Sequence, residues 1–290
     1  MYLARAYGLG IASEIPLLEL SPGCAVADVR VSVENLADYR PASPDSVICD
    51  LRHLGSGTFL IEHGNSILVD PLPEAEERVV RLHLLSFALT ALLRQRGFLV
   101  LHGSALARDG HAVAFLGSSR SGKSTIAGML LSRGYQLLAD DMVAIPCTET
   151  TTHELMVVPG FPQVKLWPDS AAVIGQDPAL LNRLHPLREK RDWRISSAFA
   201  HEATPLDHIY VLSNGPAVQV ERLGPQEAVR ELIRHTARIA FLPLADAATH
   251  LRQCAVLVDR VPVSRLTIPR AFESLPALAD LIDRTLPLAR

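Results

Sequence analysis

The fold of this chain is decided by residues 115–145, which read FLGSSRSGKSTIAGMLLSRGYQLLADDMVAI. Within them, residues 117–124 read GSSRSGKS and match the phosphate-loop pattern G-x-x-x-x-G-K-[ST] in full. The apolar run before this loop is typical of a buried strand, and the run after it is typical of a helix that ends at Gly134. Glycines let backbone N–H groups wrap a phosphate, and the start of a helix adds partial positive charge. We therefore predict a nucleoside triphosphate site, in preference to a plain glycine- and serine-rich turn.

The predicted site would hold ATP and Mg²⁺. The Lys123 side chain would reach the β- and γ-phosphates, and the Ser124 hydroxyl would bind the metal ion. Whether Arg120 touches a phosphate or only water stays open at this stage. The residues predicted to bind the nucleotide are Gly117, Ser118, Ser119, Arg120, Ser121, Gly122, Lys123, Ser124 and Thr125.

Two carboxylates follow the predicted helix almost at once. Residues 135–141 read YQLLADD, a strand pattern that ends in Asp140 and Asp141. Ligands of open α/β sheets bind beyond the C-terminal ends of the strands, so both carboxylates are expected near the metal and the phosphates. One of them can hold Mg²⁺ through water while the other accepts a proton from an attacking hydroxyl. A helix cap or a turn is the alternative for such a pair.

Residues 101–145 resemble the catalytic core of the HPr serine kinase/phosphorylase family. The match covers the strand LHGSALA, the phosphate loop, the segment RGYQLLADD and the apolar strand behind it, about 45 residues. The resemblance implies an α/β fold with a P-loop core, a mixed sheet and flanking helices, and a kinase that phosphorylates a serine hydroxyl with ATP. It also implies that His102 lies near the transferred phosphate, that Asp140 is the base, and that Asp141 helps to organise Mg²⁺. The swapped assignment of the two carboxylates stays open, and a hydrogen-bonded histidine at a strand end is the alternative for His102.

Two segments depart from that family. Residues 159–175, PGFPQVKLWPDSAAVIG, lack the glutamate of the family's glycine-rich signature, and residues 7–20 differ from its regulatory domain. The chain is similar instead to a divergent branch found beside biosynthetic clusters for ribosomal peptides, notably lasso peptides. That similarity implies phosphorylation of a precursor peptide, at a serine near its C-terminus. It makes HPr itself and the reverse phosphorolysis reaction less expected.

The bulk composition narrows the class of protein. The chain has 290 residues and a net charge of −3, without a strong basic run, so neither nucleic acid nor membrane is an expected partner. Its four cysteines show no CxxC spacing, and no signal segment or membrane-length apolar run is present, which indicates a cytoplasmic protein with reduced thiols. Homo-oligomers are possible, since HPr kinases assemble as hexamers, but no interface is readable from the sequence.

We predict two domains, an N-terminal β-rich module (1–73) and a P-loop kinase domain (74–290). The module is a candidate for recognising a substrate peptide by β-augmentation. Hairpins are expected around Gly64 and at Asp109-Gly110, and helices over 74–96, 226–235, 246–258 and 271–285.

The polar segment 182–205 is expected to be a long mobile loop. Its Lys190 and Arg191 could close over the γ-phosphate or grip an acidic peptide, and a solvated charged loop is the alternative. Lys165 and Trp167 could line a substrate groove or serve only in packing.

Two further functions remain compatible with the sequence. One is a kinase of a small hydroxyl compound such as free serine, and the other is a nucleotide-gated binding or regulatory module without kinase activity. The motifs of small GTPases, eukaryotic protein kinases and serine hydrolases are absent from the sequence.

Overall fold

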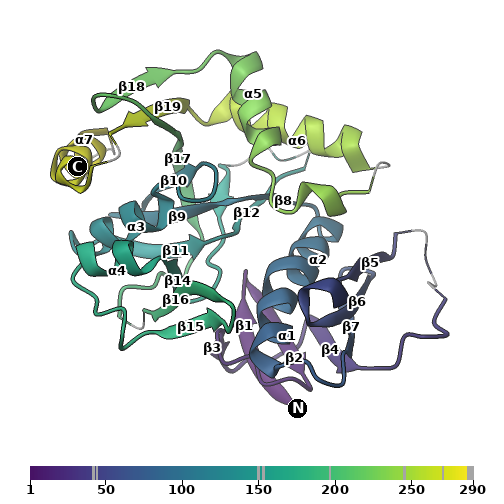
Figure 1. Ribbon diagram of the computed structural model, residues 1–290. Helices are drawn as coiled ribbons and strands as arrows, with labels where there is room; N and C mark the ends of the chain where they lie inside the picture. The colour runs from purple at the N-terminus through teal and green to yellow at the C-terminus, as the bar shows by residue number, and fades with distance from the viewer. Residues whose placement is uncertain are drawn as a thin grey trace.

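The protein is a mixed α/β molecule (Figure 1). The computed structural model describes residues 1–40, 43, 45–148, 151, 154–195, 197–243, 246–269 and 271–285. Over these residues, two seven-stranded sheets, one three-stranded sheet and one two-stranded sheet are combined with helices. No helix in this part of the chain has the length and apolarity needed to cross a membrane. All four cysteines are free thiols, as predicted.

The N-terminal residues form the first seven-stranded sheet, which has the order β3-β1-β2-β4-β7-β6-β5. The predicted hairpin around Gly64 is confirmed, because the two strands that flank it pair antiparallel. The strands are β1 (Tyr2–Ala6), β2 (Leu9–Ser13), β3 (Ser21–Pro22), β4 (Val29–Val33), β5 (Val47–Asp50), β6 (Gly57–Glu62) and β7 (Ser66–Pro71).

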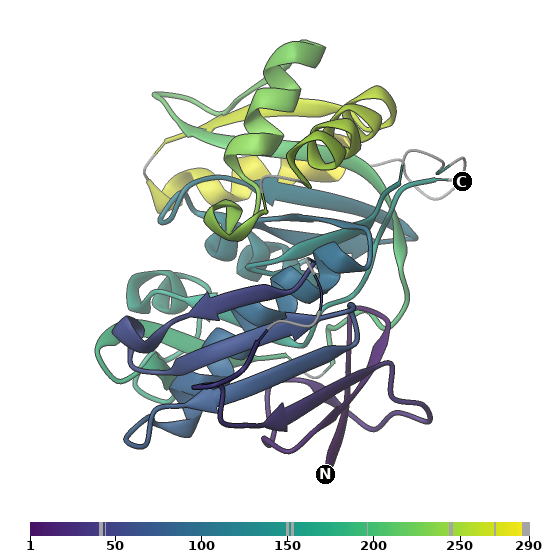
Figure 2. The same cartoon turned by 90° about the vertical axis from the view of Figure 1, so that its right-hand side faces the viewer.

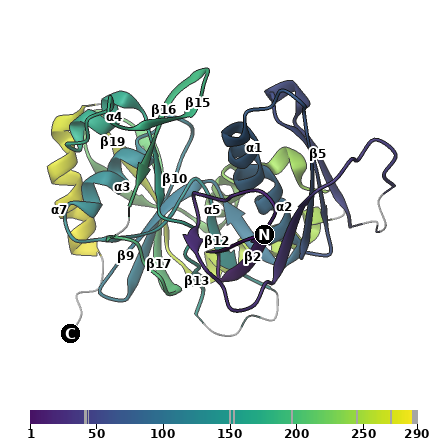
Figure 3. The same cartoon turned by 90° about the horizontal axis from the view of Figure 1, so that it is seen from below.

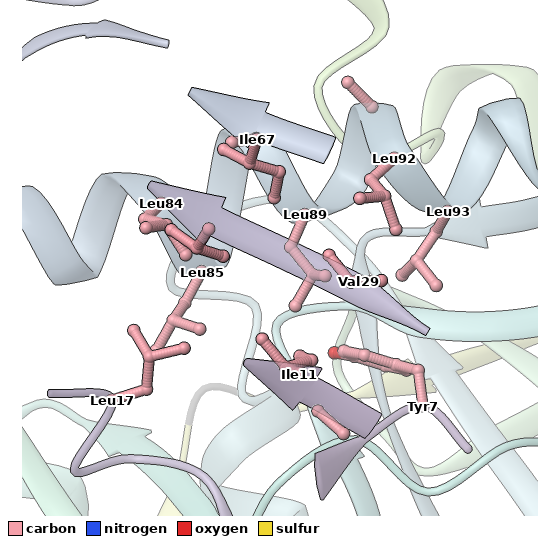
Figure 4. Close-up of a cluster of buried hydrophobic side chains, with 14 of the residues drawn as sticks. Tyr7, Ile11, Leu17, Val29, Ile67, Leu84, Leu85, Leu89, Leu92 and Leu93 are labelled. Carbon is pink, nitrogen blue, oxygen red and sulfur yellow. The ribbon is translucent and has the colours of Figure 1, made fainter. Parts of the chain in front are cut away.

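A helical segment covers one face of this sheet. It consists of α1 (Glu77–His83), the π-helical turn η2 (Leu84–Ala88) and α2 (Leu89–Gln95), and begins later than predicted because Glu76 is still extended. Its leucines point toward the apolar side chains of the sheet, where they bury a common core (Figure 4). The predicted domain boundary at residue 73 falls between this sheet and the helix that covers it, and it stays a prediction.

The second seven-stranded sheet carries the predicted phosphate loop and has the order β11-β9-β10-β17-β19-β18, with β13 paired to β17. β10 runs parallel to β17, and β9 lies antiparallel between β10 and β11. β10 and β11 therefore run in the same direction and end at the same edge. The strands are β9 (Gly103–Arg108), β10 (His111–Leu116), β11 (Gln136–Asp140), β13 (Met156–Val157), β17 (Thr204–Asn214), β18 (Gln219–Arg222) and β19 (Val263–Ile268).

Helices cover both faces of this second sheet (Figures 1 and 2). Val113 and Phe115 of β10 pack with α3 (Lys123–Leu131) and α7 (Leu275–Thr285). The alternate β10 residues, Ala112, Ala114 and Leu116, pack with α5 (Pro225–Arg234) and α6 (Ala247–Arg260). The two small strands β8 (Phe98–Leu101) and β12 (Val143–Pro146) pair with each other beside this core. Burial on both faces explains why β10 is apolar throughout.

The prediction of a long mobile loop over 182–205 is wrong for most of its length. β15 (Asn182–His185) and β16 (Arg188–Arg194) form a hairpin, and β16 also pairs with β14 (Gln163–Leu166). One face of this small sheet is apolar, because Val164 and Leu166 are fully buried. The charged residues of β16 have partners nearby; Arg194, for example, donates to Asp192 at 2.8 Å. The segment resembles a loop in sequence because it is polar, and several of its side chains are exposed although its backbone pairs in strands.

The Asp283 carboxylate on α7 ties that helix to the sheet and to the end of α3. It accepts hydrogen bonds from Arg108 at 2.7 Å, from the Tyr135 hydroxyl at 2.8 Å and from Arg133 at 2.9 Å. Burial would raise the pKa of Asp283, but its bonds with Tyr135, Arg133 and Arg108 hold that pKa below 3.8. Its negative charge therefore stabilises the folded state.

We expect Asp283→Asn to lower the free energy of unfolding by about 1.5–3 kcal/mol near neutral pH, because hydrogen bonds to a charged group are lost. Since the folded-state pKa is lowered, the stabilisation by charged Asp283 is complete at pH values above 3.8, the ordinary pKa of the carboxyl group. It disappears as the pH falls through the folded-state pKa. Urea unfolding over a pH series measures it. Asp280→Asn, at a carboxylate that is 56% exposed and pairs with Arg133, is the matched control and should cost less. If the difference in free energy of unfolding between the wild type and Asp283→Asn stays the same in acid, this account is wrong.

Candidate functional site

The 117–124 loop lies between the end of β10 and the start of α3, at the edge of the sheet where β11 also ends. Arg120 and Gly122 both have left-handed backbone angles, with φ of 63° and 99°. At Gly117 an added Cβ would lie 2.5 Å from the Ser121 hydroxyl oxygen, so a larger residue does not fit. The loop therefore curls tightly at the N-terminus of α3, where the first backbone N–H groups have no partner within the helix.

Lys123 is the first residue of α3, and its side chain folds back over the loop. Its ammonium group donates to the carbonyl oxygens of Gly117 at 2.7 Å and Ser118 at 2.9 Å. The side chain is buried, and burial lowers its pKa to about 8 although Asp140 opposes the change. A desolvated cation held against the loop is well placed to bind the oxygens of a phosphate.

The Asp140 carboxylate at the end of β11 is the best connected group of the site. Its Oδ1 accepts hydrogen bonds from the Ser104 hydroxyl and, at 3.2 Å, from the Ser124 hydroxyl. Its Oδ2 accepts from the backbone N–H of Lys165 at 2.8 Å. Only 6% of Asp140 is exposed, so these donors replace the water that a buried carboxylate has lost.

Asp141 faces a different set of groups. Lys165 Nζ lies 2.7 Å from its carboxylate, His102 Nδ1 lies 3.3 Å away and Arg238 lies 3.9 Å away. Burial would raise the pKa of Asp141, but Lys165, His102 and Arg238 lower it well below its usual value. Asp141 is therefore a charged carboxylate surrounded by cationic or potentially cationic side chains.

Both carboxylates line one cavity, although neighbouring side chains on a strand point to opposite faces. Asp141 lies just beyond β11 with a φ of 81°, a left-handed conformation that aspartate tolerates better than most residues. This turn of the backbone brings the second carboxylate to the same side as the first. The predicted convergence of the pair is present, and the strand geometry alone does not produce it.

The cavity has a volume of about 810 Å³ and extends from the two aspartates along the 117–124 loop to the C-terminal region. One end is polar and contains His102 and Lys165. The opposite end is apolar apart from Asn214 and Ser274, and it joins the loop because the Ile268 side chain lies near Gly122. The apolar residues at this end are Ile268, Pro269, Ala271, Phe272 and Leu275.

Trp167 forms part of the cavity wall beside the loop. The Arg120 guanidinium stacks on its ring at 4.2 Å, and Lys190 of β16 lies 5.9 Å from the ring centre. Two buried polar atoms of the wall, Trp167 Nε1 and the Ser121 hydroxyl oxygen, have no hydrogen-bond partner within the described part of the chain. A buried polar atom without a partner costs free energy, so these two atoms are unfavourable features of the wall as it stands.

The cavity contains most of the residues predicted from sequence. His102, Asp140, Asp141, Lys190 and residues 118–125 line it, while Gly117 supports it from behind by its bond to Lys123. Arg191 does not line it, since its guanidinium bonds to the backbone oxygens of Pro178 and Glu189.

The sequence predictions missed the Ser104 hydroxyl, Arg238 and the whole apolar end. Ser104 lies two residues after His102 in the same predicted strand, so its inward orientation could have been inferred from alternation. Arg238 has a φ of 48° and stacks on Phe87 at 4.1 Å, in a turn that no motif marks. The apolar end comes from residues 268, 269 and 271–275, which show only an ordinary strand-to-helix connection in the sequence.

The donor set beside Lys123 fits Mg²⁺. The Ser124 hydroxyl and the Asp140 carboxylate supply hard oxygen atoms that already lie within 3.3 Å of each other. Among the described residues, no group of three or more His, Cys, Asp or Glu side chains could hold a metal ion unaided. Proteins usually bind Mg²⁺ through one or two side chains together with water and the phosphates of a substrate, and the two oxygen donors of Ser124 and Asp140 match that pattern.

Comparisons with known proteins give little beyond this geometry. No protein-family model matches the chain, and no curated protein matches it. Among solved structures, the chain is similar to the HPr(Ser) kinase/phosphatase from Coxiella burnetii, with 13% identity and a TM-score of 0.34 over 64% of this chain and 94% of that chain. At so low a TM-score, function has to be inferred from the site itself.

We expect a nucleotide to change the fluorescence of Trp167, because phosphate oxygens in the loop would draw Arg120 away from the indole ring. The chain has two tryptophans, and Trp193→Phe removes the other one. Titrating this variant with Mg·ATP should give a saturable change in emission. The same titration of Trp193→Phe with Lys123→Ala is the control and should saturate at a higher concentration. An unchanged spectrum in a titration that shows heat of binding would contradict the stacking account.

Proposed function

We propose that the protein is an ATP-dependent kinase that transfers the γ-phosphoryl group to a serine hydroxyl of a peptide or protein. The observation that carries the proposal is one cavity with two carboxylates in different surroundings. Asp140 lies against Ser124 and the lysine-bearing loop, and Asp141 lies against His102 and Lys165. Phosphoryl transfer needs these two roles, since one carboxylate serves the metal and the other serves the acceptor.

On the nucleotide side, the 117–124 loop and Lys123 would hold the phosphates, and Ser124 with Asp140 would hold Mg²⁺. The metal ion would neutralise charge on the β- and γ-phosphate oxygens. Asp140 suits this role better than that of the base, because its carboxylate already shares the Ser124 hydroxyl. We therefore favour the swapped assignment, in which Asp140 serves the metal and Asp141 serves the acceptor.

On the acceptor side, His102 and Asp141 form a pair. His102 Nδ1 lies 3.0 Å from the backbone carbonyl oxygen of Asp141, which can only accept a hydrogen bond, so the proton of the neutral ring belongs on Nδ1. Nε2 is then left with a lone pair and can take the proton of the substrate serine hydroxyl. At the same time, the oxygen of that serine bonds to the γ-phosphorus. The bond from that phosphorus to the β–γ bridging oxygen breaks in the same step, and ADP leaves. Asp141, whose lowered pKa makes it a weak base, would orient the imidazole and stabilise its positive form.

A narrower form of this proposal takes the substrate to be a ribosomal precursor peptide, as the sequence resemblance implies. Nothing in the cavity itself distinguishes such a peptide from another serine-containing chain. Two alternative functions remain. One is a kinase that phosphorylates free serine, and the other is a nucleotide-gated module without kinase activity. The cavity opposes the second of these, because binding ATP alone would not require Asp141, His102 and Lys165 beside the phosphate loop.

We expect Asp140→Asn and Asp141→Asn to fail in different ways. Asp140→Asn should raise the Mg²⁺ concentration needed for half-maximal transfer by about tenfold or more, because a metal-holding group is weakened. Asp141→Asn and His102→Gln should lower kcat by roughly 10²-fold or more at an unchanged Mg²⁺ requirement, because proton acceptance is impaired.

The measurement is mass spectrometry of a panel containing free serine, serine peptides and HPr after incubation with Mg·ATP. Asp259→Asn changes an exposed carboxylate on α6, outside the cavity, and should leave transfer unchanged. Phosphate on free serine alone would favour the small-molecule kinase. No phosphate on any acceptor, from protein that binds ATP, would favour the gated module.

The apolar end of the cavity would hold the adenine base. Phe272 is 45% exposed beside this end although it is a large apolar side chain, so a flat ring can cover it. Adenine is such a ring, and stacking of a base on an aromatic side chain contributes about 1–3 kcal/mol. The Ile268 side chain lies near Gly122 of the loop, so a base at the apolar end would be next to the phosphate site.

We expect Phe272→Ala to weaken the binding of ATP by about tenfold and to leave the binding of inorganic triphosphate unchanged. Calorimetry with both ligands separates the base from the phosphates and needs no acceptor. Leu251→Ala, at an exposed apolar residue of α6, is the matched control and should change neither. Equal loss for ATP and triphosphate would show that Phe272 supports the fold of the site and does not bind the base.

A further inference from the structure

A second, smaller cavity lies on the far side of Lys165. It has a volume of about 230 Å³ and is enclosed by the loop after β2, by α1 and by the β14–β16–β15 sheet. Figure 3 shows β15 and β16 standing beside α1, with the N-terminal strands next to them. Lys165 lines this cavity as well as the larger one, so the two share a wall at the acceptor side of the site.

The side chains that line the smaller cavity include more cations than carboxylates. Five cationic side chains line it against two carboxylates, Glu19 and Asp192. Both carboxylates already have partners among the residues that line the cavity. Glu19 pairs with Arg81 at 3.1 Å. Asp192 accepts hydrogen bonds from Gln163 and from Arg194, each at 2.8 Å. The cationic residues are Arg78, Arg81, Lys165, Arg183 and Arg194.

Two of these arginines are available to a ligand. Arg78 and Arg183 have side chains that are 43% and 47% exposed. Their partners, Glu76 and Glu189, are exposed too, and such surface ion pairs contribute little. An acidic ligand could therefore compete with Glu76 and Glu189 for these two arginines at the rim of the smaller cavity.

A row of polar side chains on β14 and β16, here called the strip, contributes to the linings of both cavities. Val164 and Leu166 of β14 are fully buried, so Gln163 and Lys165 point to the opposite, polar face. Lys165 is directly paired with Asp192 of β16. Lys190 lies two residues before Asp192 on the same strand face, and it lines the larger cavity beside Trp167. The strip thus runs from Lys190 through Lys165 into the smaller cavity.

We propose that this strip and the smaller cavity bind the acceptor as an extended peptide segment with acidic side chains beside the phosphorylated serine. The inference rests on the proposed kinase function, because it places the serine at His102 and Asp141 and its neighbours along the strip. In-line transfer brings the acceptor to the γ-phosphate from the side opposite the leaving ADP. The apolar end of the larger cavity takes the base, so the acceptor enters from the Lys165 end. A free amino acid would leave the smaller cavity unfilled.

The first test measures binding without turnover. Short fluorescent peptides with one serine, flanked by glutamates or by lysines, are titrated with the protein and a non-hydrolysable ATP analogue, and anisotropy is recorded. We expect the acidic peptide to bind more tightly, and its affinity to fall with added salt. The double variant Arg78→Glu with Arg183→Glu should weaken that binding by about tenfold or more and leave the affinity for the ATP analogue unchanged.

The control is Arg30→Glu with Arg230→Glu, two exposed arginines on β4 and α5 that line neither cavity and give the same change of net charge. It should bind the acidic peptide like the wild type. Equal affinity for acidic and basic peptides, or equal weakening in both double variants, would overturn the proposed acceptor strip.

The second test distinguishes a failure of the proposed acceptor strip from a failure of the proposed kinase function. Transfer from Mg·ATP to the same two peptides and to free serine is followed by mass spectrometry. Faster phosphorylation of the acidic peptide, lost in Arg78→Glu with Arg183→Glu, supports the strip. Phosphorylation of both peptides at equal rates, or of free serine alone, overturns the strip and leaves a kinase. Tight binding of the acidic peptide without transfer to it would support the strip and count against the kinase.

Discussion

The hydrogen bonds of the Asp140 carboxylate hold the site together. They join β11 to β9 through Ser104, to α3 through Ser124 and to β14 through the backbone of Lys165. A buried carboxylate without such donors would cost several kcal/mol, so these hydrogen bonds favour the arrangement in which β9, α3 and β14 meet at Asp140. The same bonds fix the Ser124 hydroxyl at the mouth of the 117–124 loop. The contacts that stabilise the fold are thus the ones that would place a metal ion beside the phosphates.

Lys165 extends this arrangement to the acceptor side. Its backbone N–H bonds to Asp140 and its side chain pairs with Asp141, so one residue of β14 sets the position of both carboxylates. It also separates the two cavities and lines each of them. A shift of the β14–β16–β15 sheet would therefore alter the nucleotide side and the acceptor side together. Because one wall of the smaller cavity comes from the N-terminal part, at Leu18 and Glu19, that part can influence the site.

The local features were predictable from the sequence, and the long-range ones were not. The loop pattern and the YQLLADD strand end mark short segments whose geometry follows from neighbouring residues, and both lie where they were expected. The pairing of Asp141 with Lys165 and Arg238 joins segments far apart in the chain, and no local pattern records it. The 182–194 hairpin lacks the alternation of buried and exposed residues that marks a strand, since none of the residues of β15 and β16 is fully buried, and its strand pairing with β14 joins segments that are apart in the chain. The exposure of Phe272 becomes informative only in the structure, where residues 268, 269, 271, 272, 274 and 275 line the same cavity as the 117–124 loop.

The cationic side chains of the site are held in fixed positions on two sides of it. A phosphoryl group in transfer carries negative charge on its equatorial oxygens, and the groups that stabilise it should be cationic and held in place beforehand. Lys123 is fixed to the loop by two backbone oxygens, and Lys165 and Arg238 are fixed by Asp141 on the other side. Under the proposed mechanism, Asp141 would keep two cations close to the path of transfer while staying charged itself. Its lowered pKa makes it a poor base and lets it hold those cations, so the proton of the acceptor hydroxyl would go to His102 instead.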